Sequence, residues 1–208
     1  MNAFFDAALI ETDIDSGALG MLGAVVRRFE EPGTYRATVR LHDRTVQVFY
    51  LSVDKDSPVA AADIDLANLD GCDSETFSVN PRGYALFRVS GGKGGYSVRL
   101  RRTDPDERTP VFDTAALDGG SAFAARVLRP GTYAVSNSLG DGRARLKVAY
   151  PPAAFSGYRP PDALHVEVTR QGFEPERIEL MPLQGLIFDC HAPARIVIRL
   201  EDPDDGPG

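Results

Sequence analysis

EEPGTYRATV, residues 30–39, is the first of three stretches that share a Pro-to-Tyr phrase. The others are VNPRGYALFRV (residues 79–89) and LRPGTYAVSNS (residues 128–138), so the phrase recurs about every fifty residues. Proline presets φ at a corner, and glycine permits the positive φ that some turns require. The tyrosine that follows can bury its ring while its hydroxyl reaches a polar partner. We therefore interpret the phrase as a chain reversal that opens a strand.

Other marks recur with the same period. Upstream of the phrase, TDIDSGAL (residues 12–19) matches ADIDLANLDG (62–71) and VFDTAALDG (111–119). Downstream, an alternating apolar strand recurs four times: Val46, Val48 and Tyr50; Tyr96, Val98 and Leu100; Leu146, Val148 and Tyr150; Ile196, Ile198 and Leu200. The fourth copy carries LMPLQGLIFDC (180–190) in place of the phrase. Four copies of one unit indicate an array, a propeller or a duplicated sandwich.

Each unit is predicted to hold about four short antiparallel strands, which makes the fold class all-β. After Tyr35, apolar and polar residues alternate, so Tyr35, Ala37, Val39 and Leu41 share one face and Arg36, Thr38, Arg40 and His42 share the other. Such half-polar strands are typical of antiparallel sheets with one solvated face. In the second unit, we expect strands at Ala62–Leu66, Glu75–Val79, Tyr84–Val89 and Tyr96–Arg101.

Two architectures fit four such units. The pattern favours two tandem β-sandwiches, at residues 1–103 and 104–208, divided within the polar stretch RRTDPDERTP (101–110). A single four-bladed propeller is the alternative, because a blade also has four antiparallel strands. The proline-rich connection at residues 150–162 breaks the even spacing that a closed ring prefers. An acidic flexible tail is expected at residues 202–208.

Composition limits the partners. The net charge of −7 argues against a dedicated nucleic-acid binder and gives no help toward an anionic membrane. No apolar run is long enough for a membrane helix, and the first residues lack the basic start of a secretory signal. A cytoplasmic location is the simpler interpretation. Whether Cys72 and Cys190 pair is left open, because two cysteines are no disulfide framework.

Two stretches resemble cupredoxin-like and bacterial immunoglobulin-like β-sandwich domains. VLRPGTYAVSNSLGDGRARLKVAY (127–150) resembles their closing hairpin, and VEVTRQGFEPERIEL (166–180) is similar to an early strand pair. The resemblance implies the fold only. The copper set of cupredoxins is absent, because Cys190 and His191 are neighbours that point to opposite faces of a strand, and Met181 precedes them.

Metal chemistry has one candidate set. The residues His42, Asp43, Asp189, Cys190 and His191 are expected at hairpin tips, and imidazole, thiolate and carboxylate ligands suit zinc or copper. The alternative interpretation is a group of solvated turn residues. Calcium binding is considered because three stretches are rich in aspartate: TDIDSG, ADIDLANLDGCD and EDPDDGPG. None of them has the ligand order of an EF-hand loop. Asx turns with the local backbone are the alternative for those aspartates.

No catalytic residue is nominated. The chain has no Gly-x-Ser-x-Gly elbow and no catalytic-cysteine signature. We therefore predict a non-enzymatic structural or interaction scaffold that binds other protein chains, or copies of itself, within a larger assembly. A metal- or small-ligand-binding protein of cupredoxin type is the alternative.

Overall fold

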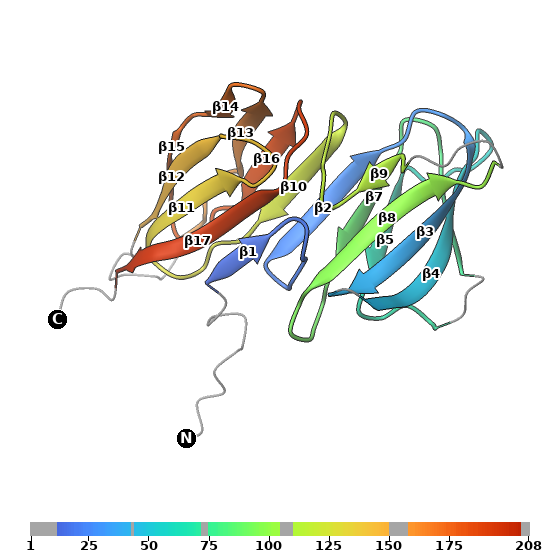
Figure 1. Cartoon of the computed structure of the whole chain (residues 1–208), viewed down its shortest axis with the longest axis horizontal. Coiled ribbons are helices and arrows are strands. Elements are labelled where there is room, and N and C mark those ends of the chain that lie inside the picture. Colours follow the sequence, from blue (N-terminus) through green and yellow to red (C-terminus); the bar gives the residue numbers. More distant parts are fainter. Residues whose placement is uncertain (1–11, 43, 72–74, 105–109, 150–157, 205–208) are drawn as a thin grey trace, which may run out of the picture.

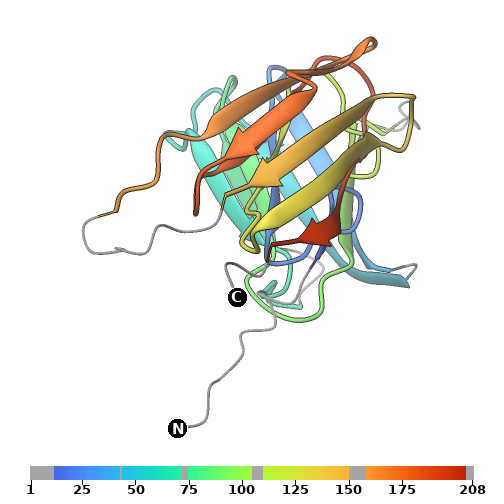
Figure 2. The same cartoon turned by 90° about the vertical axis from the view of Figure 1, so that its left-hand side faces the viewer.

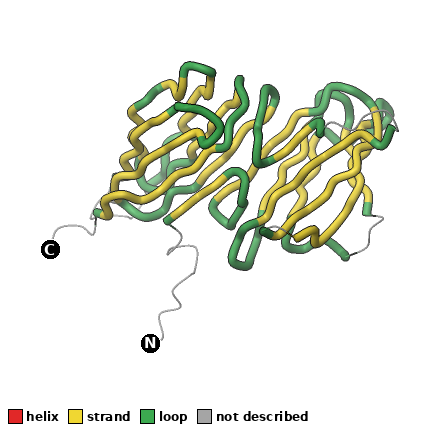
Figure 3. Tube along the Cα trace, viewed as in Figure 1, coloured by secondary structure: helices red, strands yellow, loops and turns green. Residues whose placement is uncertain are grey.

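The computed structural model describes residues 12–42, 44–71, 75–104, 110–149 and 158–204. Strands and loops make up all of these residues (Figure 3), so the prediction of an all-β fold is confirmed. The strands predicted in the second unit are found within one residue of their expected ends, at Ala61–Asp65, Thr76–Val79, Tyr84–Arg88 and Tyr96–Arg102.

The strands form three sheets (Figure 1). The N-side sheet has the order β6 (Thr76–Val79), β4 (Arg44–Val53), β3 (Gly33–Leu41), β8 (Tyr96–Arg102), β9 (Phe112–Asp113). The C-side sheet has the order β15 (Arg177–Leu180), β12 (Arg143–Val148), β11 (Gly131–Asn137), β17 (Ile196–Pro203), β1 (Asp13–Asp15). The shared sheet has the order β5 (Ala61–Asp65), β7 (Tyr84–Arg88), β2 (Gly23–Arg28), β10 (Ser121–Ala125), β16 (Leu186–Cys190), β13 (Leu164–Thr169), β14 (Gly172–Glu174).

The sheet orders relate the N half (residues 12–104) to the C half (residues 110–204). Strand β3 lies between β4 and β8 as β11 lies between β12 and β17. At the middle of the shared sheet, β2 pairs antiparallel with β10, and Val25 lies opposite Phe123. One face of this sheet is buried along its length, and it packs in two layers with the outer sheets (Figure 2).

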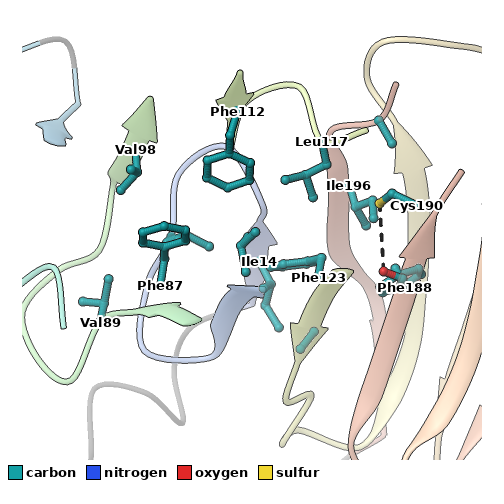
Figure 4. Packing of buried hydrophobic residues seen from close by; sticks show 14 of the residues in the cluster. Ile14, Phe87, Val89, Val98, Phe112, Leu117, Phe123, Phe188, Cys190 and Ile196 are labelled. Atoms are coloured by element: carbon teal, nitrogen blue, oxygen red, sulfur yellow. Dashed lines mark hydrogen bonds between the residues drawn. The ribbon is translucent and has the colours of Figure 1, made fainter. Parts of the chain in front are cut away.

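The two halves exchange one strand each. Strand β1 pairs with β17 of the C half, where Ile14 lies opposite Ile198. Strand β9 pairs with β8 of the N half, and the ring of Phe112 stacks on Phe87 with centroids 5.3 Å apart (Figure 4). The buried apolar side chains of both halves form one connected cluster. Strands therefore cross the predicted boundary at residue 103 in both directions.

The finer architecture is confirmed as neither of the two predicted arrangements. A propeller blade keeps four consecutive strands in one sheet, whereas β1, β2 and β3 lie in three different sheets. Two separate sandwiches would not share a sheet, whereas β2 and β10 are neighbours in one. The physical reason is long-range pairing, of β2 with β10 in the shared sheet and of β1 with β17 in the C-side sheet. Of the predicted proline-rich connection and acidic tail, residues 150–157 and 205–208 lie outside the described residues.

The Pro-to-Tyr phrase has the predicted structural role at two of its three sites. The hydroxyl of Tyr35 donates to the carbonyl of Glu31 at 2.9 Å, and the hydroxyl of Tyr133 donates to the carbonyl of Arg129 at 2.7 Å. Both rings are 2% exposed. Gly131 has φ of 145°, and a Cβ there would lie 2.5 Å from the carbonyl oxygen of Asp202, so no other residue fits.

The third site is different. Tyr84 is 41% exposed and opens β7 in the shared sheet, not a strand of an outer sheet. The positive φ at this corner belongs to Arg82, at 71°. The ring of Tyr84 is therefore on the open face of the shared sheet, and the predicted equivalence of this phrase with the other two is wrong.

The apolar alternation is also wrong in phase on one strand. Residues Val98, Val148 and Ile198 are buried as expected. On β4, however, Val46 is 47% exposed, and the buried set is Phe49, Leu51 and Val53. Strand β4 is apolar on both faces, so its sequence does not show which face is buried; pairing with β3 sets the phase.

Candidate functional site

The outer face of the N-side sheet carries a group of arginines. On β3, the apolar residues Tyr35, Ala37 and Val39 point into the core, as predicted. Arg36 and Arg40, which alternate with them, therefore point to the outer face. Burial of the apolar residues of β3 thus places both arginines on the outer face of the sheet.

Strand β8 places further arginines beside these two. Arg36 lies opposite Arg101, and Thr38 lies opposite Arg99. On the other side of β3, Tyr50 lies opposite Arg36. Like charges on directly opposed strand positions destabilise a sheet. The charges of Arg36 and Arg101 therefore do not stabilise the sheet through their contact with each other.

These side chains line a groove of about 580 Å³, which we call the arginine face. Its lining residues are Arg36, Thr38, Arg40, Thr45, Tyr50, Arg99, Arg101, Arg102 and Thr103. Among these lining residues there are five arginines and no carboxylate. The lining is positive on a chain whose net charge is −7.

Two of the arginines are held by the fold. Arg99 donates from Nε to Asp113 of β9 at 2.7 Å. Arg102 donates to Glu31 at 2.8 Å and to Asp104 at 3.1 Å, and its guanidinium lies 5.8 Å from the ring centroid of Tyr35. These contacts orient both side chains at the margin of the groove.

Two others have charges available for a ligand. Arg36 and Arg101 are exposed, and within the described part of the chain neither forms an ion pair with a carboxylate. The contact of Arg36 is a hydrogen bond to the hydroxyl of Thr38 at 3.4 Å. A bound carboxylate or phosphate would find two adjacent guanidinium groups with unused donors.

The C half provides an internal comparison. At the positions equivalent to Arg36, Arg40 and Arg99 it has Ala134, Ser138 and Val197, respectively. Arg101 has a counterpart in Arg199, which lies opposite Ala134. The equivalent sheet therefore forms without most of the arginines. Their presence in the N half is not a requirement of the strand architecture.

The predicted metal candidates on β16 are divided between the two faces of the sheet. Cys190 is 2% exposed and its thiol contacts the carbonyl of Phe188 at 3.9 Å (Figure 4). Burial, together with the charges of Asp189 and Asp118, raises the pKa of Cys190 to about 12. Cys190 thus packs in the core, on the opposite face of the strand from Asp189. Cys72 lies outside the described residues.

Asp189 and His191 point to the open face and meet two residues that the sequence analysis did not nominate. His165 Nδ1 lies 2.6 Å from Asp189, and His191 Nε2 forms a hydrogen bond with Glu167. The parallel pairing of β13 with β16 brings these pairs together, and that pairing leaves no local mark in the sequence. In the residues that the structure describes, no group of three His, Cys, Asp or Glu side chains could hold a metal ion.

His42 is placed in a different sheet from His191. It lies in the turn between β3 and β4, where its amide donates to the carbonyl of Gly95 at 2.8 Å. Its ring packs so closely on Gly95 that a Cβ there would lie 2.4 Å from it. Asp43 lies outside the described residues. The two predicted hairpin histidines therefore do not belong to one site in this structure.

Two of the aspartates considered for calcium make local turns. Asp15 and Asp65 each accept a hydrogen bond from the amide two residues on, at 2.8 and 3.2 Å, and Asp113, which lies outside the calcium candidates, does the same at 2.9 Å. These are the Asx turns proposed as the alternative. Burial raises the pKa of Asp65, but hydrogen bonds from Ser90, Asn68 and Ala67 outweigh it and lower the pKa to about 2.

The arginine face itself was missed as a site. Its signal was the alternation Arg36, Thr38, Arg40 on the polar side of β3, which was interpreted only as a solvated face. Arg99 and Arg101 alternate in the same way on β8. Their position beside β3, however, depends on the pairing of two strands that are distant in the sequence. Comparison of the chain with protein-family models, curated proteins and solved structures finds no match. Within the described ranges there is also no helix able to span a membrane.

Proposed function

We propose that this protein is a non-enzymatic β-scaffold whose arginine face binds an acidic segment of another protein chain. The observation that carries the proposal is the lining of the groove, with five arginines and no carboxylate on a chain of net charge −7. A face of this kind attracts anionic partners and fixes their orientation more than it adds raw affinity.

Carboxylate is the chemistry that the face fits. Guanidinium groups bind carboxylates through paired hydrogen bonds, and Arg36 and Arg101 are adjacent and exposed. Thr38, Thr45 and Tyr50 add hydroxyl donors within the same groove. Arg36, Thr38 and Arg40 alternate along β3, so an extended peptide lying along this strand would meet several of these groups in succession.

An acidic peptide is favoured over a nucleic acid for two reasons. A long polyanion would extend past the groove onto the rest of the surface. That surface would repel it, because the chain as a whole has a negative charge. Binding of single strands also depends on aromatic residues that stack with bases. Tyr50 is the one aromatic side chain that lines the described groove.

The scaffold character rests on the architecture. We propose that each half is a sandwich-like unit, the N-side or C-side sheet packed on its part of the shared sheet. The exchanged strands β1 and β9 then join the halves into one rigid body with a continuous core. A rigid body holds the arginine face in a fixed position relative to the rest of the molecule, as a connector in an assembly requires.

The test is binding of a fluorescently labelled oligoglutamate peptide, followed by anisotropy. We expect the variant R36Q/R101Q to bind at least about tenfold more weakly than the wild type, because two charge-assisted contacts are lost. The matched control is R145Q/R199Q, which removes two arginines from the outer face of the C-side sheet and leaves binding unchanged. Raising the salt concentration from about 0.05 M to about 0.5 M weakens binding through screening.

Two results would overturn the proposal. One is equal affinity of R36Q/R101Q and the wild type for oligoglutamate. The other is tighter binding of a single-stranded oligonucleotide than of oligoglutamate at the same salt concentration, which would assign the face to nucleic acid.

A further inference from the structure

The open face of the shared sheet is apolar at its centre. Four neighbouring strands, β7, β2, β10 and β16, direct half-buried apolar residues to it: Ala24, Val26, Leu86, Ala122, Ala124 and Ile187. A sheet with one solvated face usually alternates apolar and polar residues. The outer face of the N-side sheet follows that rule with Arg36, Thr38 and Arg40. The centre of the open face is therefore built like a surface that is covered.

Part of this face forms a groove of about 480 Å³, which we call the apolar groove. It crosses the strands where β2 and β16 begin and where β7 and β10 end. Arg88, Ala24, Ala124 and Ile187 lie opposite one another in this order and form one row of the lining. At the usual spacing of neighbouring strands, this row is about 14–15 Å long. The volume is also within the range of about 300–1,000 Å³ that small-molecule sites occupy.

One positive charge in the lining has no counter-ion among the residues that the structure describes. Arg126 follows the end of β10 and continues the outward series of Ala122 and Ala124. Its amide donates to the carbonyl of Leu22 at 2.8 Å, which fixes the backbone at this point. Arg126 is exposed and forms no ion pair with a described carboxylate. It lines the apolar groove and also a neighbouring cavity of about 340 Å³.

The other charge in the lining is already neutralised. Arg88 donates from Nε to Asp63 at 2.7 Å and from Nη1 to Asp65 at 3.2 Å. Arg88 lies on β7, and β2 separates that strand from β10. The apolar groove therefore offers one guanidinium group to a ligand, on its β10 side, and that group belongs to Arg126.

We propose that the apolar groove binds an amphipathic carboxylate, with its alkyl chain across Ala24, Ala124 and Ile187 and its carboxylate on Arg126. The apolar side chains remove the alkyl chain from water, and the guanidinium group forms charge-assisted hydrogen bonds with the carboxylate. The site lies on a different sheet from the arginine face. The inference is therefore independent of the proposed function.

An alkyl chain fits the floor of the groove better than a peptide does. The side chains of Ala24, Ala124 and Ile187 have no hydrogen-bonding groups. The amides and carbonyls of a peptide pressed against them would lose water without gaining a partner. An alkyl chain has no such groups, and the length of the row suits an extended chain of medium length.

The first experiment is titration of the full chain with decanoate, below its micelle concentration, followed by calorimetry. We expect R126Q to bind decanoate at least about tenfold more weakly than the wild type, because a charge-assisted contact is lost. R126K keeps the charge and should retain most of the affinity. R28Q is the matched control, since it removes another exposed arginine at the end of β2, outside the groove lining. The neutral analogue 1-decanol should bind the wild type and R126Q equally.

The second experiment fills the groove. Ala124→Leu places a larger side chain in the middle of the row and should abolish binding of decanoate. Ala122→Leu is the matched control, because Ala122 lies on the same strand and the same face but does not line the groove. It should bind decanoate like the wild type. Thermal unfolding of both variants checks that they are folded.

Each contrary result overturns a stated part of the inference. Failure of decanoate to bind the wild type overturns the site, and equal binding to A124L and A122L places the ligand elsewhere. Unchanged affinity of R126Q overturns the assignment of the carboxylate to Arg126. A wild type that forms dimers in analytical ultracentrifugation, is monomeric as A124L and does not bind decanoate assigns the groove to a second copy of the chain. Oligoglutamate binding, measured on A124L, reports on the arginine face separately.

Discussion

The N half and the C half share their strand order and their hydrogen bonds but differ in the chemistry of their outer faces. The amide of Ile196 donates to the hydroxyl of Ser16 at 3.0 Å, and the amide of Val98 donates to the hydroxyl of Thr114 at 3.1 Å. Ser16 and Thr114 are both fully buried. Because these two residues make equivalent hydrogen bonds in the two halves, we assign them a structural role.

The residues that differ between the halves point to function. Arg36 has Ala134 as its counterpart, and Arg99 has Val197, at the same register positions of equivalent sheets. The same sheet forms with arginine or with a small or apolar residue at these positions. The arginines are therefore explained by something other than the stability of the sheet. The molecule thus contains its own control, and each prediction below tests whether a pair of equivalent residues behaves alike or differently.

The largest effect is expected at the centre of the shared sheet, where the halves meet. Phe123 is fully buried and stacks with Phe188, with centroids 6.2 Å apart. Phe123→Ala should lower the free energy of unfolding by about 3–5 kcal/mol, because it leaves a cavity. Val25→Ala, at the equivalent position, should cost about 1–3 kcal/mol, since less apolar surface is lost. Urea unfolding of both variants measures the difference. Equal losses of unfolding free energy would show that the volume of the removed side chain does not set the cost at these two positions.

Next in size are the buried hydroxyls. Ser16→Ala and Thr114→Val should each lower the free energy of unfolding by about 1–3 kcal/mol, because a buried amide loses its acceptor. The two losses should agree, since the contacts are equivalent. Ser136→Ala, on the outer face of β11, is the control and should change stability by less than about 0.5 kcal/mol. Unequal losses for Ser16 and Thr114, measured by urea unfolding, would break the equivalence of the halves.

Acid should affect one turn of the N half. The pKa of Asp65 is lowered from 3.8 to about 2, so the folded state favours its charged form. Its contribution to stability is present above pH 3.8 and is lost as the pH falls through about 2. Asp65→Asn should therefore reduce the acid dependence of stability in that window, measured by urea unfolding at several pH values. Asp63→Asn, which alters the same contact with Arg88, is the control and should keep it; carboxyl titration by NMR checks the pKa directly.

Removal of a tyrosine hydroxyl should have a smaller effect. Tyr35→Phe and Tyr133→Phe each delete one hydrogen bond to a carbonyl and should lower the free energy of unfolding by about 0.5–1.5 kcal/mol. Tyr84→Phe should leave stability unchanged, because that ring is 41% exposed. A loss at Tyr84 as large as at Tyr35 would restore the equivalence of all three Pro-to-Tyr phrases.

The smallest change in stability is expected on the arginine face. Arg36→Ala should alter the free energy of unfolding by less than about 0.5 kcal/mol, or raise it slightly by relieving repulsion from Arg101. Arg195→Ala is the contrast, because Arg195 holds Asp15 through two hydrogen bonds of 2.9 and 2.7 Å and should cost about 1 kcal/mol. A marked loss for Arg36→Ala would make the face structural and weaken the case for a binding site.

Local features were predictable from the sequence, and long-range pairing was not. The strands of the second unit and the inward face of β3 follow from alternation and turn residues, which act between neighbours. The pairing of β1 with β17 joins residues far apart, such as Asp15 and Arg195, and no local pattern encodes it. The phase of β4 was missed because both of its faces are apolar, and Tyr84 was misjudged because its phrase resembles the others in letters but not in backbone conformation.

The candidate site shows the same division. The outward position of Arg36 and Arg40 follows from the alternation on β3 alone. That Arg99 and Arg101 join them requires the pairing of β3 with β8, which are separated by β4 to β7 in the chain. The His165–Asp189 and His191–Glu167 pairs likewise depend on the parallel register of β13 and β16.

The pairing of β1 with β17 also bears on how the chain is made. Asp15 and Arg195, which are joined beside this pairing, are 180 residues apart, so β1 is synthesised long before β17. Contacts between residues so far apart slow the search for the native state, and the C-side sheet cannot be completed until β17 has been synthesised. Until then Ile14 lacks its partner Ile198, which makes this interval a period when the chain is open to wrong pairing or to chaperones.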